Sequence, residues 1–469
     1  MKKILLLLCL IAGFVSCNDD DVQESGRLKL EVPELTLNSV AADIQKEVIL
    51  TGVTGEPAVT VDPSSREWCE AEVKRAAVNK STAAEGWVVA VTAKQYTGNT
   101  DRKAYITVTS GLDEVQLIVI QTGRGKTVRM IVVNEGQFTK GTAALSAITY
   151  EGTTTFDIFR DVNSMPLGDV AQSITCINGK YFVVLNNSNQ IKVVEPQTFK
   201  LVSTIDYEEK SASPRFVAPL SDSTALVSDL NRQLTIIDTK KYKVLDYIDI
   251  SSQIEKMTVV GKKVFCAAGG AGVKVFDTDK PISASAMRSV EGTEGGVMKT
   301  AKMILDKNEK LWVMTTSSDE TILNCIDPAT EKVVKKVEIP YVQKGTDEYV
   351  AGCITAGTYY NRMDTDRTRG KLYFYMTMLI NPERGTTIGA IFTLDVDKNA
   401  IEPKAYRELP GLGMMYGMGI SPEGDVFLCD CLDYTAQRGF LREYKEDGTV
   451  ISNRVGIYPR MVYFTEYDK

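Results

Sequence analysis

The 469-residue chain contains no histidine, which excludes Ser-His-Asp and Cys-His catalysis and every metal site that needs a histidine ligand. Its formal net charge of −7 is small for its length, so the overall charge does not favour a nucleic-acid partner. Nine cysteines are present without a Cys-X-X-Cys pair, and the common zinc and redox motifs therefore find no support.

The first 16 residues have the pattern of a signal peptide. Lys2 and Lys3 precede an apolar stretch that ends near Ser16 and is too short to span a bilayer. The small residues before Cys17 resemble a bacterial lipobox, which implies that residues 1–16 are removed and that Cys17 is acylated. The alternative is cleavage by ordinary signal peptidase, with Cys17 incidental.

Residues 17–26 are expected to form a lipidated acidic tether. The run Asp19–Asp21 after Cys17 resembles the surface-export signal of Bacteroidetes lipoproteins. This resemblance implies a protein that is lipid-anchored in the outer membrane and faces the cell exterior. No later segment is apolar over about 18 residues, so the lipid is expected to be the only contact with the membrane.

Residues 27–124 are predicted to form a small antiparallel β-sandwich. Alternating apolar and polar residues between Gly, Pro and Asn indicate strands, and such runs occur at 28–32, 87–91, 105–108 and 115–120. The Trp68-Cys69 pair, residues 99–102 and Ala104–Gly123 resemble the BACON domain of Bacteroidetes surface proteins. The resemblance implies either a spacer or an accessory domain that binds carbohydrate or mucin.

A short β-rich unit recurs from residue 128 to residue 469. Its clearest copy, residues 173–206, has four apolar runs separated by turns such as Asn178-Gly179. Recurrence at roughly 40–45 residues is typical of propeller blades, and seven such units can be counted along the chain. The run 458–464 is predicted to be the innermost strand of blade one and to close the ring. The predicted fold class is all-β, with an Ig-like sandwich followed by a seven-bladed β-propeller.

The propeller segment resembles the YncE-like propellers of the DUF5074 type. The resemblance is carried by Val133–Gly136, Leu167–Asp169, Ser213–Arg215 and Gly456–Pro459. That family includes surface lipoproteins that capture cobalamin for a TonB-dependent transporter in gut Bacteroidetes. The resemblance therefore implies ligand binding and a TonB-dependent receptor as partner. The family is broader than this activity, so membership does not name the ligand.

Alignment of the blades by their Gly-Lys turns selects five residues at the start of innermost strands. Four of the five are cationic and belong to different blades: Arg215, Lys256, Lys302 and Arg460, with Ser173 as the fifth. A ring of positive charge at the mouth of the channel predicts an anionic ligand. The alternative is that these cations pair locally, for example with Glu255, or extend into solvent.

Blade seven begins with Met414, Tyr416 and Met418 between glycines. Thioethers, an aromatic ring and close backbone approach would suit a large amphipathic macrocycle, and packing beneath the mouth is the alternative. The loops between second and third strands supply further candidate polar contacts, which are Asn134, Asn187 and Arg232.

The sequence singles out no catalytic pair, calcium loop or phosphate-binding glycine loop, and we expect neither a cofactor nor a metal. The leading hypothesis is a non-enzymatic surface protein that captures a small-molecule or glycan ligand, such as a corrinoid, for a TonB-dependent transporter. The alternatives are a surface protein that binds or cleaves polysaccharide as a lyase or hydrolase, and an adhesive or structural surface protein.

Overall fold

The chain divides into a first unit, Met1–Arg124, and a second unit, Gly125–Lys469. The computed structural model describes residues 27–37, 44–79, 84–96, 98, 100–207, 211–293, 302–316, 321–339, 351–352, 362–381 and 386–467. The expected signal peptide, Cys17 and the tether lie outside these residues. Within these ranges, no helix is long and apolar enough to cross a membrane.

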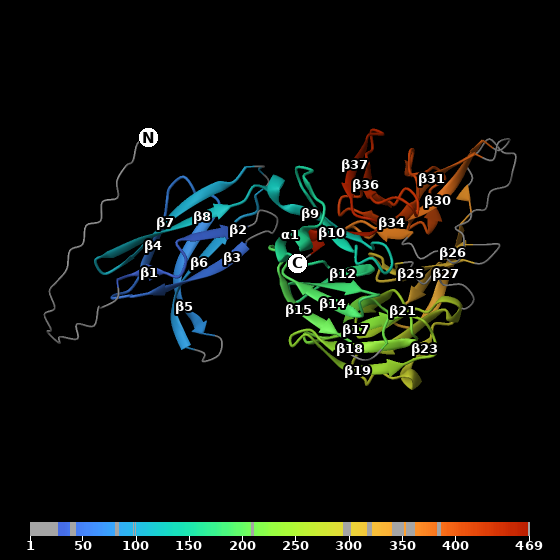
Figure 1. Ribbon diagram of the computed structural model, residues 1–469, viewed down its shortest axis with the longest axis horizontal. Coiled ribbons are helices and arrows are strands. Elements are labelled where there is room, and N and C mark those ends of the chain that lie inside the picture. The colour runs from blue at the N-terminus through green and yellow to red at the C-terminus, as the bar shows by residue number, and fades with distance from the viewer. Residues whose placement is uncertain are drawn as a thin grey trace, which may run out of the picture. The chain divides into compact units, whose positions relative to one another are not determined.

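Two four-stranded sheets form the first unit (Figure 1). One has the order β1 (Lys29–Leu30), β3 (Ile44–Thr51), β6 (Ala84–Ala93) and β5 (Cys69–Asn79). The other has the order β2 (Glu34–Leu37), β8 (Asp113–Gln121), β7 (Arg102–Ser110) and β4 (Ala58–Val61). β2 and β8 run parallel, whereas the sequence predicts only antiparallel pairs. The difference arises because the chain crosses from one sheet to the other between β1 and β2.

The alternation seen in the sequence builds the core of the sandwich. Ile106 and Val108 of β7 are buried, while Tyr105 beside them is 43% exposed. At one edge, the guanidinium carbon of Arg102 lies 4.1 Å from the ring centroids of both Trp68 and Tyr96. These cation–π contacts tie the segments that flank the sheets to one another.

Seven sheets in succession form the second unit, and most strands of each sheet pair with their neighbours in the sequence. Blade one contains β38 (Pro459–Phe464), β9 (Val128–Asn134), β10 (Ala144–Thr149) and β11 (Thr154–Thr155), followed by the helix α1 (Ile158–Asn163). Blade two contains β12 (Ala171–Ile177), β13 (Lys180–Leu185), β14 (Gln190–Val194) and β15 (Leu201–Asp206). Blade three contains β16 (Pro214–Pro219), β17 (Thr224–Asp229), β18 (Gln233–Asp238) and β19 (Lys243–Asp249).

The remaining blades follow the same plan. Blade four contains β20 (Met257–Val260), β21 (Lys263–Ala267), β22 (Val273–Asp277) and β23 (Arg288–Ser289), and blade five contains β24 (Ile304–Leu305), β25 (Leu311–Thr316), β26 (Thr321–Asp327) and β27 (Lys332–Ile339). Blade six contains β28 (Ala351–Gly352), β29 (Met363–Thr365), β30 (Lys371–Asn381), β31 (Thr386–Asp395), β32 (Ala400–Ile401) and β33 (Arg407–Glu408). Blade seven contains β34 (Met415–Ile420), β35 (Val426–Asp430), β36 (Gly439–Tyr444) and β37 (Val450–Val455).

The strand β38 closes the ring of blades. It pairs antiparallel with β9, with Tyr463 opposite Ile131, and so becomes the innermost strand of the first blade. The ring of Tyr463 also meets Tyr181 of blade two edge to face, at a centroid distance of 5.7 Å. Apolar clusters of this kind lie between neighbouring blades. The predicted fold class, an all-β chain with an Ig-like sandwich and a seven-bladed propeller, is confirmed.

Candidate functional site

Four innermost strands carry a β-bulge close to their first residue. A bulge adds one residue to a strand and re-aims its side chain. The bulged residues are Gln172 in β12, Arg215 with Phe216 in β16, Tyr416 in β34 and Arg460 in β38. The equivalent residue of blade two is therefore Gln172, not Ser173 as the alignment of the sequence suggests. Ser173 instead donates its hydroxyl hydrogen bond to the backbone oxygen of Arg215 at 2.7 Å.

Side chains from blades seven, one, four and three meet in a continuous polar chain, which we call the channel network: Tyr416, Glu135, Arg460, Glu255 and Arg215. The Tyr416 hydroxyl donates to Glu135 Oε1 at 3.1 Å, and Arg460 Nη1 donates to Glu135 Oε2 at 2.8 Å. Glu255 Oε2 lies 4.0 Å from Arg460 Nη2 and accepts a hydrogen bond from Arg215 Nη2 at 3.0 Å. Contact between residues of four blades places this network on the channel axis.

Most of the channel network is removed from solvent, with Glu135 its most exposed member. Arg215 is 5% exposed, Arg460 is 7% exposed and Glu255 is fully buried. Burial lowers the pKa of Arg215, and the charge of Arg460 adds to this shift. For Arg460 burial acts in the same direction, but Glu135 and Glu255 outweigh it and raise the pKa. Mutual pairing is what keeps buried ions charged.

The network nevertheless has hydrogen-bonding capacity that the protein does not use. Within the part of the chain that the structure describes, Glu255 Oε1, Arg215 Nε and Gln172 Oε1 are buried without a hydrogen-bond partner. Buried polar atoms are nearly always satisfied, so orphaned atoms at one end of a channel mark this region as a candidate site for a polar ligand.

Lys256 and Lys302 differ in their surroundings. Lys302 Nζ lies 2.5 Å from Asp364 Oδ1, and Asp364 Oδ2 accepts the backbone hydrogen bond of Ile420 at 3.1 Å. Lys256 is half-buried, and its Nζ lies 3.9 Å from the centroid of the Phe216 ring. Burial, followed by the charges of Lys302 and Arg460, lowers the pKa of Lys256 to about 7. Three of the four predicted cations thus pair with carboxylates. Local pairing is the alternative that the sequence left open to a ring of free positive charge. Lys256 does not follow it.

Three tyrosines surround the end of the network and form the tyrosine cluster: Tyr416, Tyr434 and Tyr458. Their ring centroids lie 5.9 to 6.4 Å apart, and the Tyr458 hydroxyl donates to the backbone oxygen of Tyr434. Tyr416 is buried, whereas Tyr434 is 58% exposed. Tyr434 follows the second strand of its blade and Tyr458 precedes β38, so both belong to loops at the mouth.

The methionines predicted for the mouth separate into two environments. Met414 is half-buried and donates its backbone hydrogen bond to Asp430. Met418 is buried with Tyr373 and Leu428 in the core between blades six and seven, so the prediction that it lines the mouth is wrong. Gly417 does not admit a ligand either, because a Cβ there would lie 2.0 Å from the carbonyl oxygen of Arg460. The glycine permits close packing against β38.

The three predicted loop residues do not converge. Asn134 is fully buried, and its amide nitrogen donates to Ala144 O and Ser146 Oγ, so its prediction as a ligand contact is wrong. Asn187 is exposed and donates to Asp169 Oδ2 at 2.6 Å. Arg232 is an exposed turn residue with φ of 59°. Turn geometry accounts for Arg232 without a ligand.

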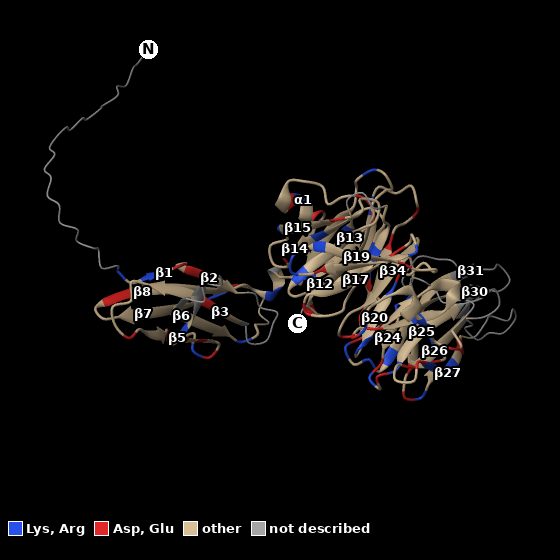
Figure 2. Cartoon of the chain, turned by 90° about the horizontal axis from the view of Figure 1, so that it is seen from below, with Lys and Arg blue, Asp and Glu red and all other residues tan. Residues whose placement is uncertain are grey.

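The sequence hypothesis missed Gln172, Phe216 and Tyr458. One signal was available, because the dipeptide Pro-Arg occurs both at 214–215 and at 459–460, where each arginine is a bulged residue. Basic and acidic residues are otherwise interspersed over the loops of the propeller (Figure 2). Among the described residues, no group of three or more His, Cys, Asp and Glu side chains could hold a metal ion.

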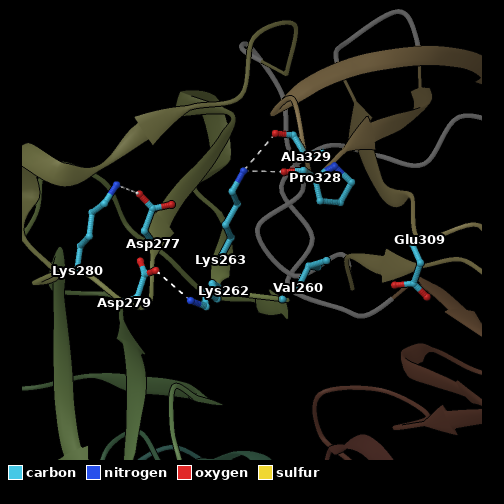
Figure 3. Close-up of a pocket in the computed structure, with 10 residues that line it drawn as sticks. Val260, Lys262, Lys263, Asp277, Asp279, Lys280, Glu309, Pro328 and Ala329 are labelled. Carbon is cyan, nitrogen blue, oxygen red and sulfur yellow. Dashed lines mark hydrogen bonds and ion pairs between the residues drawn. The ribbon is translucent and has the colours of Figure 1, made fainter.

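A charged pocket of about 530 Å³ lies on the turns between blades four and five (Figure 3). These turns follow first and third strands, so they lie at the opposite end of the strands from the mouth. Lys263 reaches across to the backbone oxygen of Pro328 at 2.8 Å and to Glu331 at 2.8 Å. Arg288 joins Asp277 to Glu331 at 2.9 and 2.8 Å. The charged groups therefore link two blades to each other.

Comparison with known protein families gives two matches. Residues 128–388 match the family described as "Domain of unknown function (DUF5074)". Residues 58–122 match the BACON family, described as "Putative binding domain, N-terminal". No curated protein matches the chain.

Solved structures resemble the chain in fold. A quinonprotein alcohol dehydrogenase-like protein from Bacteroides thetaiotaomicron has a TM-score of 0.52 at 13% identity, over 94% of this chain and 98% of that protein. Hydrazine synthase from Kuenenia stuttgartiensis has a TM-score of 0.43 at 12% identity, over 58% of this chain and 75% of that chain. At such identities the first likeness shows the fold alone.

We predict that Glu255→Gln destabilises the propeller strongly. The substitution preserves shape but removes the charge that faces buried Arg215, and breaking a buried pair in this way costs about 3–5 kcal/mol of unfolding free energy. Glu309→Gln is the matched control, because Glu309 pairs with Arg369 while it is 64% exposed, which is worth at most about 1 kcal/mol. Urea denaturation followed by circular dichroism compares the two. Equal losses would contradict burial of the network.

We also predict that the link between blades four and five weakens in acid. The hydrogen bonds of Arg288 and Lys263 lower the pKa of Glu331 to about 2, and those of Lys280 and Arg288 lower the pKa of Asp277 to about 2. The stability that these carboxylates contribute is present above their ordinary pKa values near pH 4 and is lost as the pH falls to about 2. The double variant Asp277→Asn, Glu331→Gln should show a shallower fall of Tm over this range than the wild type. Parallel curves would argue against the link.

Proposed function

We propose that the propeller of this chain captures a small ligand at the mouth of the channel. The chain belongs to the DUF5074 family of β-propellers and carries a BACON domain. This combination is that of a Bacteroidetes surface-type binding protein. The observation that carries the proposal is the convergence of the channel network, Lys256 and the tyrosine cluster. Ligand sites combine aromatic surface with a few polar groups that fix orientation, and this end of the channel offers both.

We propose a corrinoid such as cobalamin as the ligand. The tyrosine cluster supplies aromatic surface on which a large macrocycle can rest, and Tyr434 offers the most exposed face. The cation of Lys256 suits a phosphate group on such a ligand. A corrinoid can be held by its periphery, so the lack of histidine in the chain is no obstacle.

The proposed setting is the outer surface of the outer membrane. Acylation of Cys17 would hold the protein there, the acidic tether and the sandwich would separate the propeller from the membrane, and a TonB-dependent receptor would take up the captured ligand. The sequence around Cys17 and the run Asp19–Asp21 support this arrangement. In it, the sandwich acts as a spacer or as an accessory that binds glycan.

We propose binding without catalysis. A polysaccharide lyase would need a base beside a cationic clamp, and Tyr416 with Arg215 or Lys256 would be the natural set. Tyr416 instead donates its hydroxyl to Glu135, and Arg215 pairs with Glu255. These contacts favour a fixed binding surface. A glycan is the second candidate ligand, because the exposed ring of Tyr434 could also carry the apolar face of a sugar.

We predict that cyanocobalamin raises the Tm of the full chain, since a ligand at 100 times its Kd stabilises the folded state by about 2.7 kcal/mol. Tyr434→Ala should weaken binding roughly fivefold through loss of an aromatic contact worth about 1 kcal/mol. Tyr105→Ala, at an exposed tyrosine of the sandwich, is the control and should bind like the wild type. Thermal shift titrations measure all three proteins.

Oligogalacturonate serves as the competing ligand in the same assay. A shift with oligogalacturonate and none with cyanocobalamin would replace the corrinoid by an acidic glycan. A cyanocobalamin shift that Tyr434→Ala leaves unchanged would move the site away from the tyrosine cluster.

A further inference from the structure

Among the four cations that the sequence places at the mouth, three are paired with carboxylates of the described residues and Lys256 is not. Each of three cations contacts a carboxylate: Arg215 with Glu255, Arg460 with Glu135, and Lys302 with Asp364. These six groups sum to zero charge when all are ionised. Lys256 is a seventh group beside these pairs, and it adds one positive charge to them when it is protonated.

The surroundings of Lys256 explain why it differs. Its ammonium nitrogen lies against the Phe216 ring and makes no hydrogen bond or ion pair with any residue that the structure describes. Lys302 and Arg460 face it and favour loss of its proton, whereas Glu255 and Asp364 favour the charged form. Those two carboxylates already contact Arg215 and Lys302.

We propose that Lys256 binds a singly charged oxyanion, a phosphodiester or a carboxylate, and that it takes up a proton when the anion binds. The inference rests on the proposed function and specifies which group of the captured ligand enters the channel. An oxyanion beside Lys256 would supply the counter-charge that the other carboxylates do not. Arg215 Nε, a buried donor without a partner among the described residues, belongs to the channel network that adjoins Lys256 through Glu255 and Arg460.

The proton balance follows from the charge of the lysine. With a pKa of about 7, the free protein holds Lys256 mainly as –NH2 at pH 8, and the anion binds the –NH3+ form. Each anion is therefore bound together with one proton taken from solution. Affinity is highest below pH 7, where Lys256 is already charged, and falls roughly tenfold for each pH unit well above it.

Isothermal titration calorimetry of the full chain with dimethyl phosphate and with propionate tests this, because neither probe changes its charge between pH 6 and pH 9. We expect at least one of them to bind at pH 6.5 and to lose roughly tenfold in affinity between pH 7.5 and pH 8.5. Titrations in two buffers of different ionisation enthalpy at pH 8.5 should report uptake of close to one proton. The probe that binds identifies the anion class.

Three variants make the test specific. Lys256→Met keeps the apolar stem against Phe216 and should lose binding, whereas Lys256→Arg should keep binding and lose the dependence on pH, since arginine stays charged. Lys262→Met is the control, because Lys262 is 80% exposed beside Asp279 at the other end of the strands. It should match the wild type. The Tm of each variant without ligand checks its folding.

The inference and the proposed function fail in different ways. If neither anion binds, or if Lys256→Met binds as the wild type does, Lys256 is not the anion site. Cyanocobalamin could still raise the Tm of both proteins, and the proposed function would then stand without this inference. An affinity that does not change between pH 7.5 and pH 8.5 would overturn the proton uptake.

Discussion

Pairing between β38 and β9 is the interaction on which the propeller and its candidate site both depend. It gives blade one its innermost strand and covers the edge of β9 that would otherwise be open. The same strand carries Arg460 into the channel, and Tyr458 precedes it. Gly417 lets blade seven approach this strand so closely that a methyl group would meet the carbonyl oxygen of Arg460. The strand that closes the ring therefore also positions the residues of the mouth.

The channel network is costly to bury. Removing a charged group from water costs several kcal/mol, which pairing recovers only with good geometry, so a buried ion pair is weak evidence for stability. Here Arg460 lies between two carboxylates, and Glu255 lies between two arginines. An arrangement that spans four blades fixes their innermost strands relative to one another. Beside it, Lys256 lies against Phe216 and the ring of Tyr434 is exposed, so an amine and an aromatic face border the network.

The fold was predictable because it depends on local patterns. Turn residues such as Asn178-Gly179 and the apolar runs between them recur in every blade, and each run can be assigned without knowledge of distant contacts. The site was predictable only in part. A β-bulge makes Gln172, instead of Ser173, the residue of blade two that is equivalent to Arg215 and Arg460. No residue type in the sequence predicts this bulge. The pairing of Arg460 with Glu135 joins residues far apart in the sequence. Met418 and Asn134 are residue types that binding loops often contain. In the structure, Met418 packs between two blades and Asn134 forms hydrogen bonds within its own blade.

We propose that ligand is held at the mouth of the propeller by the tyrosine cluster and the cations beside it. A crystal structure of the full chain grown with saturating cyanocobalamin tests this most directly. We expect the macrocycle to lie against Tyr434 and Tyr458, with its phosphodiester toward Lys256. Density for the corrinoid on the sandwich or on the outer strands of the blades, or a mouth without corrinoid in such crystals, would contradict it.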